Sequence, residues 1–332
     1  MADWKNRKVL VTGAGGFIGS HLTERLLELG ADVTAFLRYN SRHDDGFLRV
    51  LDPKLTAHLT KFYGELRELD TVQRAMKGIE VVFNLAALPG IPYSYLHPNE
   101  TIETNVIGTL NALTAARAEN VSRFVQTSTS EVYGSALYVP IDEAHPKQPQ
   151  SPYSASKISS DAIALSYYYS FNLPVAIIRP FNTYGPRQSG RAVIPTIITQ
   201  ALTMDEIKLG NLDTTRDLTF VKDTVEGFVR VAESDAAVGQ EINVGCGFEI
   251  RIGDLAKKII ELTGRDVKLS IDQERVRPTK SEVQRLFCAN QKAKELLGWE
   301  PQYDLDAGLR ATMEWFHDPD HLRYYDPARY TV

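Results

Sequence analysis

The chain has 332 residues, of which 43% are hydrophobic and 24% are charged, as is typical of a globular enzyme. The formal net charge of -5 leaves no basic surface for nucleic acid, so we do not expect that class of partner. Two cysteines, Cys246 and Cys288, are too few for a disulfide framework, which favours a reducing, cytoplasmic compartment.

The N-terminal residues MADWKNRKVLVTG lack the apolar run and the cleavage site of a signal peptide. No apolar run in the chain reaches transmembrane length, so we expect no membrane partner. The seven histidines form no metal-ligand spacing with each other or with carboxylates, and we therefore expect no metal site.

Strand-like and helix-like segments alternate through the first half of the chain. In chain order they are strand 8–12, helix 17–30, strand 32–37, a strand ending before Glu65, helix 68–78, strand 80–87, helix 101–120, strand 123–129, helix 151–171 and strand 174–180. Ser151 is the expected N-cap of the last helix, with Pro152 in its first turn. This alternation predicts an α/β fold with a doubly wound parallel sheet of the Rossmann type.

The pattern changes after Pro180, where loops lengthen and short strands mix irregularly with helices. We therefore predict a dinucleotide-binding domain over residues 1–180, with segments near 217–245 returning to it. Residues 181–332 would form mainly a smaller, mixed α/β second lobe. The last residues, YYDPARYTV, are expected to be a surface tail.

A glycine-rich turn, VTGAGGFIG, joins the first strand to the first helix. Gly13, Gly16 and Gly19 permit a tight turn and a close backbone approach, and the amides at the helix start would face a pyrophosphate. The alternative is a glycine-rich turn without a ligand. The strand before it, the helix after it and the repeated alternation that follows favour dinucleotide binding.

The end of the second strand bears on the choice between NAD and NADP. Leu37 occupies the place where an NAD site usually has an acid, and Arg38 follows it. Arg38 either binds a 2′-phosphate, which slightly favours NADP, or is a solvated surface residue. Glu65 either meets the adenine amino group or is an ordinary loop acid.

The segment YSASK places Tyr153 and Lys157 four residues apart, on one face of a helix. An ammonium group near a phenol favours the phenolate, so Lys157 is expected to lower the pKa of Tyr153. Thr129, at the end of a neighbouring strand, would offer its hydroxyl to the same substrate oxygen. The spacing is common by chance, but its combination with the glycine turn is specific.

The chain resembles the extended short-chain dehydrogenases/reductases from about Lys8 to about Phe316, with TGxxGxxG, NLAA, Thr129, YxxxK and RPFNTYGPR in family order. The resemblance implies a tightly bound nicotinamide dinucleotide, Tyr153 as base, and a nucleotide-linked sugar that is oxidised at C4 between the lobes. The implied cofactor-binding residues are Gly13, Gly16, Phe17, Ile18, Gly19, Arg38, Glu65, Leu66, Leu85, Ala86, Ala87, Asn105, Tyr153 and Lys157.

Glu131 points to a particular reaction within that family. Nucleotide-sugar 4,6-dehydratases carry Thr-Asp-Glu or Thr-Ser-Glu at this place, and Thr129-Ser130-Glu131 is similar to the second form. Once C4 is a ketone, a carboxylate can remove the acidic C5 proton, water leaves from C6, and the hydride returns there. Ser130 either positions the C6 hydroxyl or leaves its protonation to Glu131. The alternative for Glu131 is a structural carboxylate that caps the loop.

The whole pattern looks most like the 4,6-dehydratases of legionaminic-type acid pathways, which act on a nucleotide-linked N-acetylglucosamine, with GDP ahead of UDP. UDP-glucuronate decarboxylases resemble the chain at STSEVYG and YSYLHP. They and the 4-epimerases are the alternatives within the family. A non-catalytic dinucleotide-binding sensor is the alternative from another class, although the chain keeps the four residues Thr129, Glu131, Tyr153 and Lys157.

The second lobe supplies candidates for binding the nucleotide diphosphate and the sugar. By the same resemblance the expected substrate-binding residues are Tyr93, Asn182, Arg191, Arg216, Arg277 and Glu282. Each arginine has the alternative of a surface residue, Glu282 of a local ion pair, and Tyr93 of packing between the lobes. The helix that starts near Thr101 and the Tyr153 helix imply a homodimer through a four-helix bundle, with Tyr167–Tyr169 at the interface.

Overall fold

The computed structural model describes residues 3–42 and 44–327. His43 and the last five residues of the expected tail lie outside the described residues. Within these two ranges, no helix combines the length and the apolar character needed to cross a membrane.

A seven-stranded sheet forms the larger lobe, and all its strand pairs are parallel. Its spatial order is β10 (Glu241–Val244), β6 (Val175–Pro180), β5 (Arg123–Thr127), β4 (Val81–Asn84), β1 (Lys8–Thr12), β2 (Asp32–Arg38) and β3 (Thr60–Gly64). The predicted doubly wound parallel sheet is confirmed, and strand β10 joins it from the second half of the chain.

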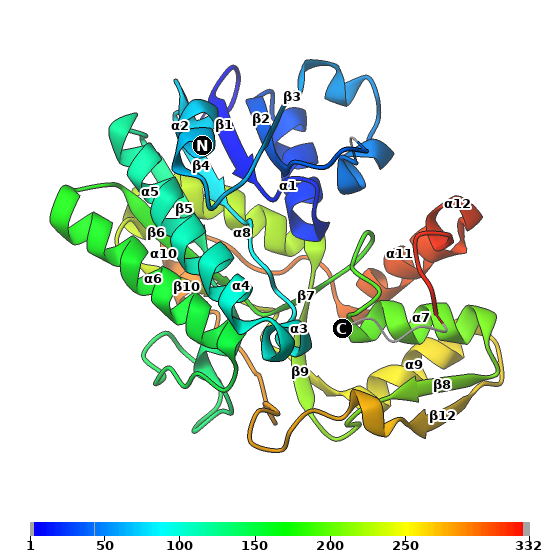
Figure 1. Cartoon of the computed structure of the whole chain (residues 1–332). Coiled ribbons are helices and arrows are strands. Elements are labelled where there is room, and N and C mark those ends of the chain that lie inside the picture. Colours follow the sequence, from blue (N-terminus) through cyan, green and yellow to red (C-terminus); the bar gives the residue numbers. More distant parts are fainter. Residues whose placement is uncertain (1–2, 43, 328–332) are drawn as a thin grey trace.

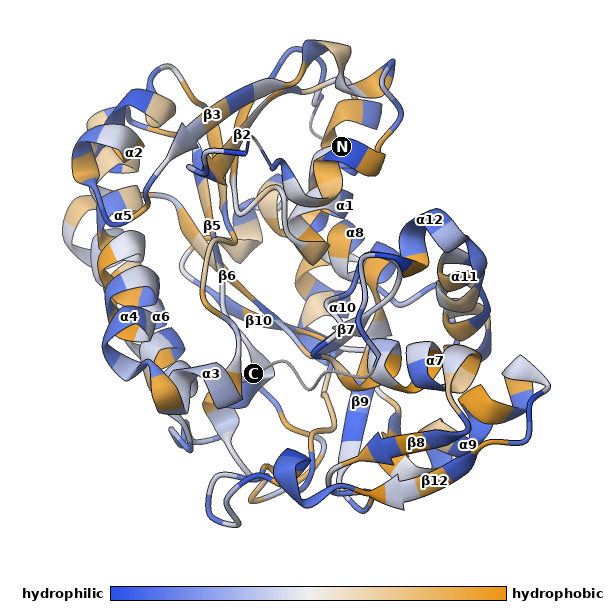
Figure 2. Cartoon of the chain, turned by 45° about the vertical axis from the view of Figure 1, so that its right-hand side comes forward, coloured by the Kyte–Doolittle hydropathy of each residue, from blue (hydrophilic) through white to orange (hydrophobic). Residues whose placement is uncertain are grey.

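Helices cover both faces of this sheet (Figure 2). They are α1 (Phe17–Glu28) and α8 (Val221–Glu233) on one face, and α2 (Leu69–Met76), α5 (Gly108–Ala118) and α6 (Pro152–Phe171) on the other. Side chains alternate along each strand, so Val9 and Val11 pack towards α1 and α8, while Leu10 packs towards α2 and α5. Burial of these apolar faces is the main stabilising contribution of the lobe.

The predicted helix 101–120 consists of three joined pieces. Helix α4 (Pro98–Ile102) continues into a π-helical turn, Glu103–Ile107, and then into α5. Such turns insert one residue into a helix and often occur at functional sites. The short helix α3 (Ile91–Leu96) precedes this run.

The smaller lobe lies beyond the carboxyl ends of the large sheet (Figure 1). Its strands are β8 (Glu206–Leu209), paired with β12 (Lys268–Ile271), and β9 (Thr215–Phe220), which lies between β7 (Asn182–Tyr184) and β11 (Glu249–Arg251). Its helices, with those near the C-terminus, are α7 (Val193–Thr203), α9 (Ile252–Thr263), α10 (Gln291–Leu297), α11 (Leu305–His317) and α12 (Pro319–Leu322).

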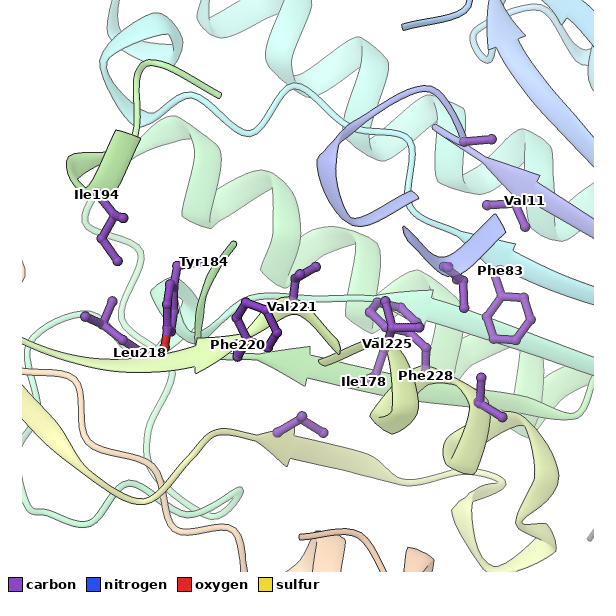
Figure 3. Close-up of a cluster of buried hydrophobic side chains, with 14 of the residues drawn as sticks. Val11, Phe83, Ile178, Tyr184, Ile194, Leu218, Phe220, Val221, Val225 and Phe228 are labelled. Carbon is purple, nitrogen blue, oxygen red and sulfur yellow. The ribbon is translucent and has the colours of Figure 1, made fainter. Parts of the chain in front are cut away.

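One continuous hydrophobic cluster joins the two lobes (Figure 3). Phe83 of the sheet meets Phe228 of α8 at a ring-centroid distance of 6.4 Å. Tyr184 and Phe220 extend the cluster into the smaller lobe, with their rings 5.7 Å apart. The lobes therefore share a core, which holds the residues on either side of the cleft in a defined relation.

The described part of the expected tail is packed rather than free. The ring of Tyr325 lies 4.7 Å from that of Phe316 in α11, and Tyr324 meets Phe47 edge-on at 6.5 Å. Aromatic side chains gain apolar contact in such positions, so residues 324–327 differ from the predicted surface tail.

Candidate active site

A cavity of about 1370 Å³ opens between the two lobes at the carboxyl ends of the parallel strands. Strands β1 to β6 each contribute residues that directly follow them, as the topology of open α/β sheets requires. Residues from β7, α7 and β9 close the opposite side. Nearly all predicted site residues line this one cavity; the exceptions are Tyr93 and Asn105.

The glycine turn forms the floor at one end. Gly13 has φ +70°, and a Cβ there would lie 3.0 Å from the Cα of Ala86, so only glycine fits. At Gly19 a Cβ would come within 2.1 Å of the Gly13 carbonyl oxygen. These two glycines let the helix start pack directly against the strand end.

The start of helix α1 suits a pyrophosphate. Gly16 is its N-cap and makes no side-chain cap, so the first-turn amides are left for a ligand. A Cβ on Gly16 would meet only the Gly13 carbonyl oxygen, at 3.2 Å, among the described residues. Phe17, Ile18 and Gly19 line the same floor. The residues present therefore fit a dinucleotide.

At the end of the cavity beside strand β2, where the adenosine of a dinucleotide would lie, a wall is formed by residues that the sequence does not indicate. Residues 44–47 fold back over the glycine turn, where the Phe47 amide donates to the Gly15 carbonyl at 2.9 Å. Gly46 has φ +62°, and a Cβ there would lie 2.2 Å from that carbonyl oxygen. No local motif predicts this contact, because it depends on where the loop after β2 returns.

Arg38 and Glu65 lie together at this end. The Arg38 side chain is 70% exposed, and its Nε is 3.9 Å from Oε2 of Glu65. Glu65 also accepts from Nε of Arg67 at 3.2 Å. Burial raises the pKa of Glu65, but the bonds and charges of the arginines outweigh burial, so the net pKa is below its ordinary value. This carboxylate is therefore anionic and shared between two cations.

The segment after β4 lines the middle of the cavity, with Leu85, Ala86 and Ala87 as expected, and Leu66 stands nearby. The amides of Leu85 and Ala86 each donate to Oγ1 of Thr12 at 3.0 Å. These bonds fix the loop beside the glycine turn.

Asn105 stands behind the cavity wall, contrary to its predicted cofactor contact. It lies on the π-helical turn and is 1% exposed. Its Oδ1 accepts from the Leu88 amide at 2.8 Å, and its Nδ2 donates to Oγ of Ser156 at 2.9 Å. The side chain therefore ties the loop after β4 to helix α6. The sequence could not show this orientation, because the π turn rotates the residue.

Helix α6 presents Tyr153 and Lys157 to the cavity. Ser151 caps the helix by accepting from the Ser154 amide, and Pro152 occupies the first turn, as predicted. Tyr153 therefore lies in the first turn and Lys157 one turn later, 8% and 4% exposed. The shared face predicted from the spacing is present.

The pKa of Tyr153 differs from the sequence-based expectation. Burial raises it above the ordinary value, a hydrogen bond with Thr129 counteracts this, and the charges of Glu131 and Asp161 raise it further. Burial also lowers the pKa of Lys157 to about 8, and Asp161 counteracts that shift. Desolvation disfavours both charged forms and outweighs the expected effect of the ammonium on the phenol.

Thr129, Ser130 and Glu131 form the wall beside the phenol. Thr129 is the N-cap of a short 3₁₀ helix, Ser130–Tyr133, and its Oγ1 accepts from the Glu131 amide at 3.3 Å. Glu131 is 9% exposed and lines the cavity. Among the described residues its carboxylate accepts no hydrogen bond, so the Thr129 hydroxyl, and not the Glu131 carboxylate, caps this turn.

The smaller lobe brings cations and an amide to the opposite wall. Arg216 in β9 is 8% exposed, and its Nη2 donates to Oε1 of Glu282 at 3.4 Å. Burial lowers the pKa of Arg216, and the charge of Glu131, which lines the same cavity, counteracts this shift. Asn182 and the largely exposed Arg191 also line this wall.

Some buried polar atoms of the residues that line the cavity have no hydrogen-bond partner among the described residues. They include Oδ1 of Asn182 and Nη1 of Arg277. The latter lies 3.7 Å from Oε1 of Glu282, an ion pair without hydrogen-bond geometry. Buried groups of this kind usually bind a partner, so these atoms indicate a place for a polar ligand.

Tyr93 does not line the cavity, contrary to the predicted contact with the hexose. Its hydroxyl donates to Glu100 at 2.6 Å, and its ring lies 4.5 Å from that of His97. Both partners belong to the loop and helix that follow Tyr93, and the alternative of packing between the lobes stays a prediction. Local spacing does not determine the direction of a side chain on such a short helix.

Further lining residues went unpredicted. They come from the irregular second lobe and are Leu209, Gly210, Asn211, Thr214, Ile252 and Arg275. None belongs to a motif, and their position depends on how β8 and β9 approach the cleft. In the part of the chain that the structure describes, no group of His, Cys, Asp and Glu is arranged to hold a metal ion.

Comparison with known sequences identifies the family. The sequence model of the family described as GDP-mannose 4,6 dehydratase matches residues 10–312. The chain belongs to this family. Its fold is accordingly that of the extended short-chain dehydrogenases/reductases.

Relatives with three different activities match at similar identity. A UDP-glucose 4-epimerase of Mycolicibacterium smegmatis is 33% identical over 94% of this chain and 99% of its own length. A dTDP-glucose 4,6-dehydratase of Streptomyces griseus is 33% identical over 96% of both chains. UDP-glucuronic acid decarboxylase 4 of Arabidopsis thaliana is 35% identical over 91% of this chain and 67% of its own length. Identity alone therefore does not select the reaction.

Solved structures agree with the fold. The dTDP-glucose 4,6-dehydratase DesIV of Streptomyces venezuelae, with NAD bound, has a TM-score of 0.85 at 29% identity and covers 97% of this chain and 99% of its own. A UDP-glucuronic acid 4-epimerase of Bacillus cereus, in complex with UDP-glucuronic acid and NAD, has a TM-score of 0.85 at 26% identity, with 93% and 99% covered.

Proposed function

We propose that this protein is a nucleotide-sugar 4,6-dehydratase with an internally recycled nicotinamide cofactor. The observation that carries the proposal is the position of Glu131. Its carboxylate shares the cavity wall with Tyr153, is nearly buried, and accepts no hydrogen bond among the described residues. A carboxylate in this state is available to take a proton from a substrate.

Tyr153, Lys157 and Thr129 would handle the C4 hydroxyl. When bound, the nicotinamide ring would accept a hydride from the sugar and return it, and its positive charge would favour the phenolate. Tyr153 would remove the hydroxyl proton, and Thr129 would hold the same oxygen, since its hydroxyl already bonds the phenol. Lys157, positively charged below a pKa of about 8, would stabilise the phenolate.

Glu131 would then act on C5. A ketone at C4 makes the C5 proton acidic, and a positioned base typically contributes about 10²–10⁴-fold to such a step. The charges of Glu131 and Arg216 interact in the same cavity. Ser130, 2% exposed beside it, would orient the C6 hydroxyl that leaves as water.

The substrate would be a nucleotide-linked N-acetylglucosamine, with GDP ahead of UDP. This choice rests on the resemblance of the sequence to the legionaminic-pathway dehydratases. The orphaned Nη1 of Arg277, with Arg216, Arg191 and the side-chain NH₂ group of Asn182, supports the diphosphate, because phosphate oxygens accept hydrogen bonds from all four groups. Glu282, held between Arg216 and Arg277, would accept from the nucleotide ribose.

NAD is the proposed cofactor. The slight preference for NADP expected from Arg38 has no support in the solved structures, since those of DesIV and the epimerase contain NAD. Glu65, 3.9 Å from Arg38, would also repel a 2′-phosphate. The mass of the cofactor released from the denatured protein tests this choice: NADP would contradict it.

A homodimer is proposed through α5 and α6. The exposed apolar side chains on this side include Ile102, Ile107, Tyr169 and Phe171, the last three being more than two-fifths exposed. Exposed apolar groups of this kind are typical of an interface between copies of a chain.

The mass of the product tests the dehydratase proposal. The purified protein is incubated in heavy water, without added oxidant, with GDP- or UDP-N-acetylglucosamine, UDP-glucuronate and UDP-galactose. Loss of one water, with deuterium at C5, is expected for an N-acetylglucosamine substrate, and Tyr153→Phe should give no product. Loss of carbon dioxide from UDP-glucuronate, or epimerisation of UDP-galactose, which leaves the mass unchanged and is followed by proton NMR, would replace the proposal by the corresponding reaction. No turnover of any sugar by protein that contains cofactor would favour the sensor.

A further inference from the structure

The segment formed by residues 277–285, here called the clamp segment, touches both the nucleotide wall and the larger lobe. Its Ser281 donates from Oγ to the Gln150 carbonyl at 2.6 Å. The Tyr95 hydroxyl lies 2.5 Å from the same Oγ. A carbonyl can only accept and a serine hydroxyl has one proton, so Tyr95 must donate to Ser281. The chain of bonds therefore runs from Tyr95 through Ser281 to Gln150.

Gln150 sits between the two catalytic elements. It directly precedes Ser151, the cap of the helix that carries Tyr153. Its Oε1 accepts from the Ser135 amide at 2.6 Å, just beyond the turn that carries Glu131. There is little free space, because a Cβ on Gly134 would lie 2.6 Å from that Oε1. A shift of Gln150 would move both proposed bases.

The clamp segment grips Gln150 twice. Besides the Ser281 bond, Nε2 of Gln150 donates to the Lys280 carbonyl at 3.0 Å. Glu282 follows Ser281 in the chain and contacts the cavity side instead. Its carboxylate pairs with Arg216 at 3.4 Å and with Arg277 at 3.7 Å. Neighbouring residues of one short segment thus face the proposed diphosphate site and the start of the catalytic helix.

We infer that Ser281 is a positioning residue that couples nucleotide binding to the alignment of Glu131 and Tyr153. The inference rests on the proposed function. A diphosphate that engages Arg216 and Arg277 would fix the clamp segment, and Ser281 and Gln150 would then hold the 3₁₀ turn and the helix start in their reactive arrangement. The coupling makes the chemical step depend on the nucleotide, so a sugar phosphate without its nucleoside would react slowly.

Hydrogen–deuterium exchange with GDP and with UDP as probes tests the coupling on the purified, cofactor-containing protein. In the parent, the better-binding nucleotide should slow exchange of amides in residues 130–135 and 151–157 by about fivefold or more, the lower end of typical coupling. The Ser281→Ala variant should show no such protection. The Ser281→Thr variant, which keeps a hydroxyl at this position, should show the same protection as the parent. Tyr95→Phe should weaken it.

Two control variants separate coupling from loosening. Tyr138→Phe removes an exposed hydroxyl that donates to Asp142, and Ser166→Ala removes one that bonds within helix α6. Both should keep the protection. Equal protection in Ser281→Ala and the parent, its loss in the controls, or no binding of either nucleotide would overturn the inference.

Steady-state kinetics distinguish a positioning role of Ser281 from a merely structural one, because kcat and KM are measured separately. Ser281→Ala should lower kcat about tenfold or more while KM for the nucleotide sugar stays near the parent value. Adding Tyr95→Phe should cost little more, since both residues belong to one chain of bonds. The exchange experiment needs no turnover. If the nucleotide protects these amides but the sugar loses no water, the proposed reaction alone is contradicted. If the sugar loses water but the amides are not protected, the coupling alone is contradicted.

Discussion

The guanidinium of Arg179 lies 3.1 Å from Oδ2 of Asp161, and neither side chain has exposed surface. Arg179 is the penultimate residue of strand β6, and Asp161 follows Lys157 by one turn of α6. The same guanidinium donates to the Tyr133 hydroxyl at 2.6 Å and pairs with Glu241 at 3.0 Å. One buried cation therefore joins the sheet, the catalytic helix and the turn that carries Glu131.

Arg179→Met should lower the free energy of unfolding by about 3–5 kcal/mol, because it leaves the buried carboxylate of Asp161 without its cation. Equilibrium urea denaturation measures this change. Arg230→Met is the control, since Arg230 pairs with Glu226 on the surface, both over 30% exposed. The free energy of unfolding of this control variant should fall by no more than about 1 kcal/mol. Equal losses in the two variants would contradict the central place given to Arg179.

His21 should make stability depend on pH. Burial, and then the charge of Arg187, lower its pKa from 6.5 to about 3, while its bond to the Pro186 carbonyl counteracts them. The ring is therefore neutral, and its 3.9 Å approach to Glu24 is no ion pair at neutral pH. Between pH 6.5 and 3 only the unfolded chain binds the proton, so stability falls as pH falls.

At pH 5 the free energy of unfolding should be about 2 kcal/mol lower because of His21. Each pH unit below its ordinary pKa of 6.5 contributes about 1.4 kcal/mol. His21→Asn removes the titrating group and keeps a donor for Pro186. Urea denaturation at pH 7.5 and pH 5 should therefore give a smaller difference for this variant. An unchanged difference would show that His21 does not contribute.

The sequence predicts the parts of the site that depend on local geometry. The glycine turn, the cap at Ser151 and the Tyr153–Lys157 face are each set by the chain within a few residues, and all three are present. The parallel sheet follows from alternation alone. Strand β10, from far along the chain, returns to its edge as the irregular pattern after residue 180 suggests.

Local sequence patterns do not predict features that depend on contacts between distant parts of the chain. Asn105 lies on a predicted helix, but a π turn directs its side chain away from the cavity, and Tyr93 lies on a short helix, α3, that the sequence does not predict. The pKa of Tyr153 is raised because its burial depends on the whole fold. Tyr325 packs on Phe316, a contact that no spacing in the tail indicates.

Gly16→Ala should remove the cofactor while preserving the fold. Its Cβ would enter the cavity at the proposed pyrophosphate site, and the Gly13 carbonyl need yield only a few tenths of an ångström. We expect at least a tenfold weaker affinity, about 1.4 kcal/mol, from calorimetric titration with NAD. Gly253→Ala in α9, where a Cβ has ordinary contacts, is the control. Full affinity in Gly16→Ala would place the pyrophosphate elsewhere.

Tyr169→Glu should convert the proposed dimer into a monomer. Tyr169 is 73% exposed on α6, and a carboxylate there would be buried without a partner in the interface. Light scattering after size-exclusion chromatography measures the mass. Leu137→Glu, at a residue 65% exposed outside these helices, should leave the dimer intact. A monomeric parent, or a dimeric Tyr169→Glu, would contradict the proposed interface.

The role of Glu131 is tested most directly by Glu131→Gln under single-turnover conditions, with product masses compared with those of the parent. The amide keeps the shape of the side chain but cannot take the C5 proton. The account predicts that the 4-keto sugar still forms with its C6 hydroxyl in place, while water loss slows about 10²–10⁴-fold. Water loss at the parent rate would contradict it.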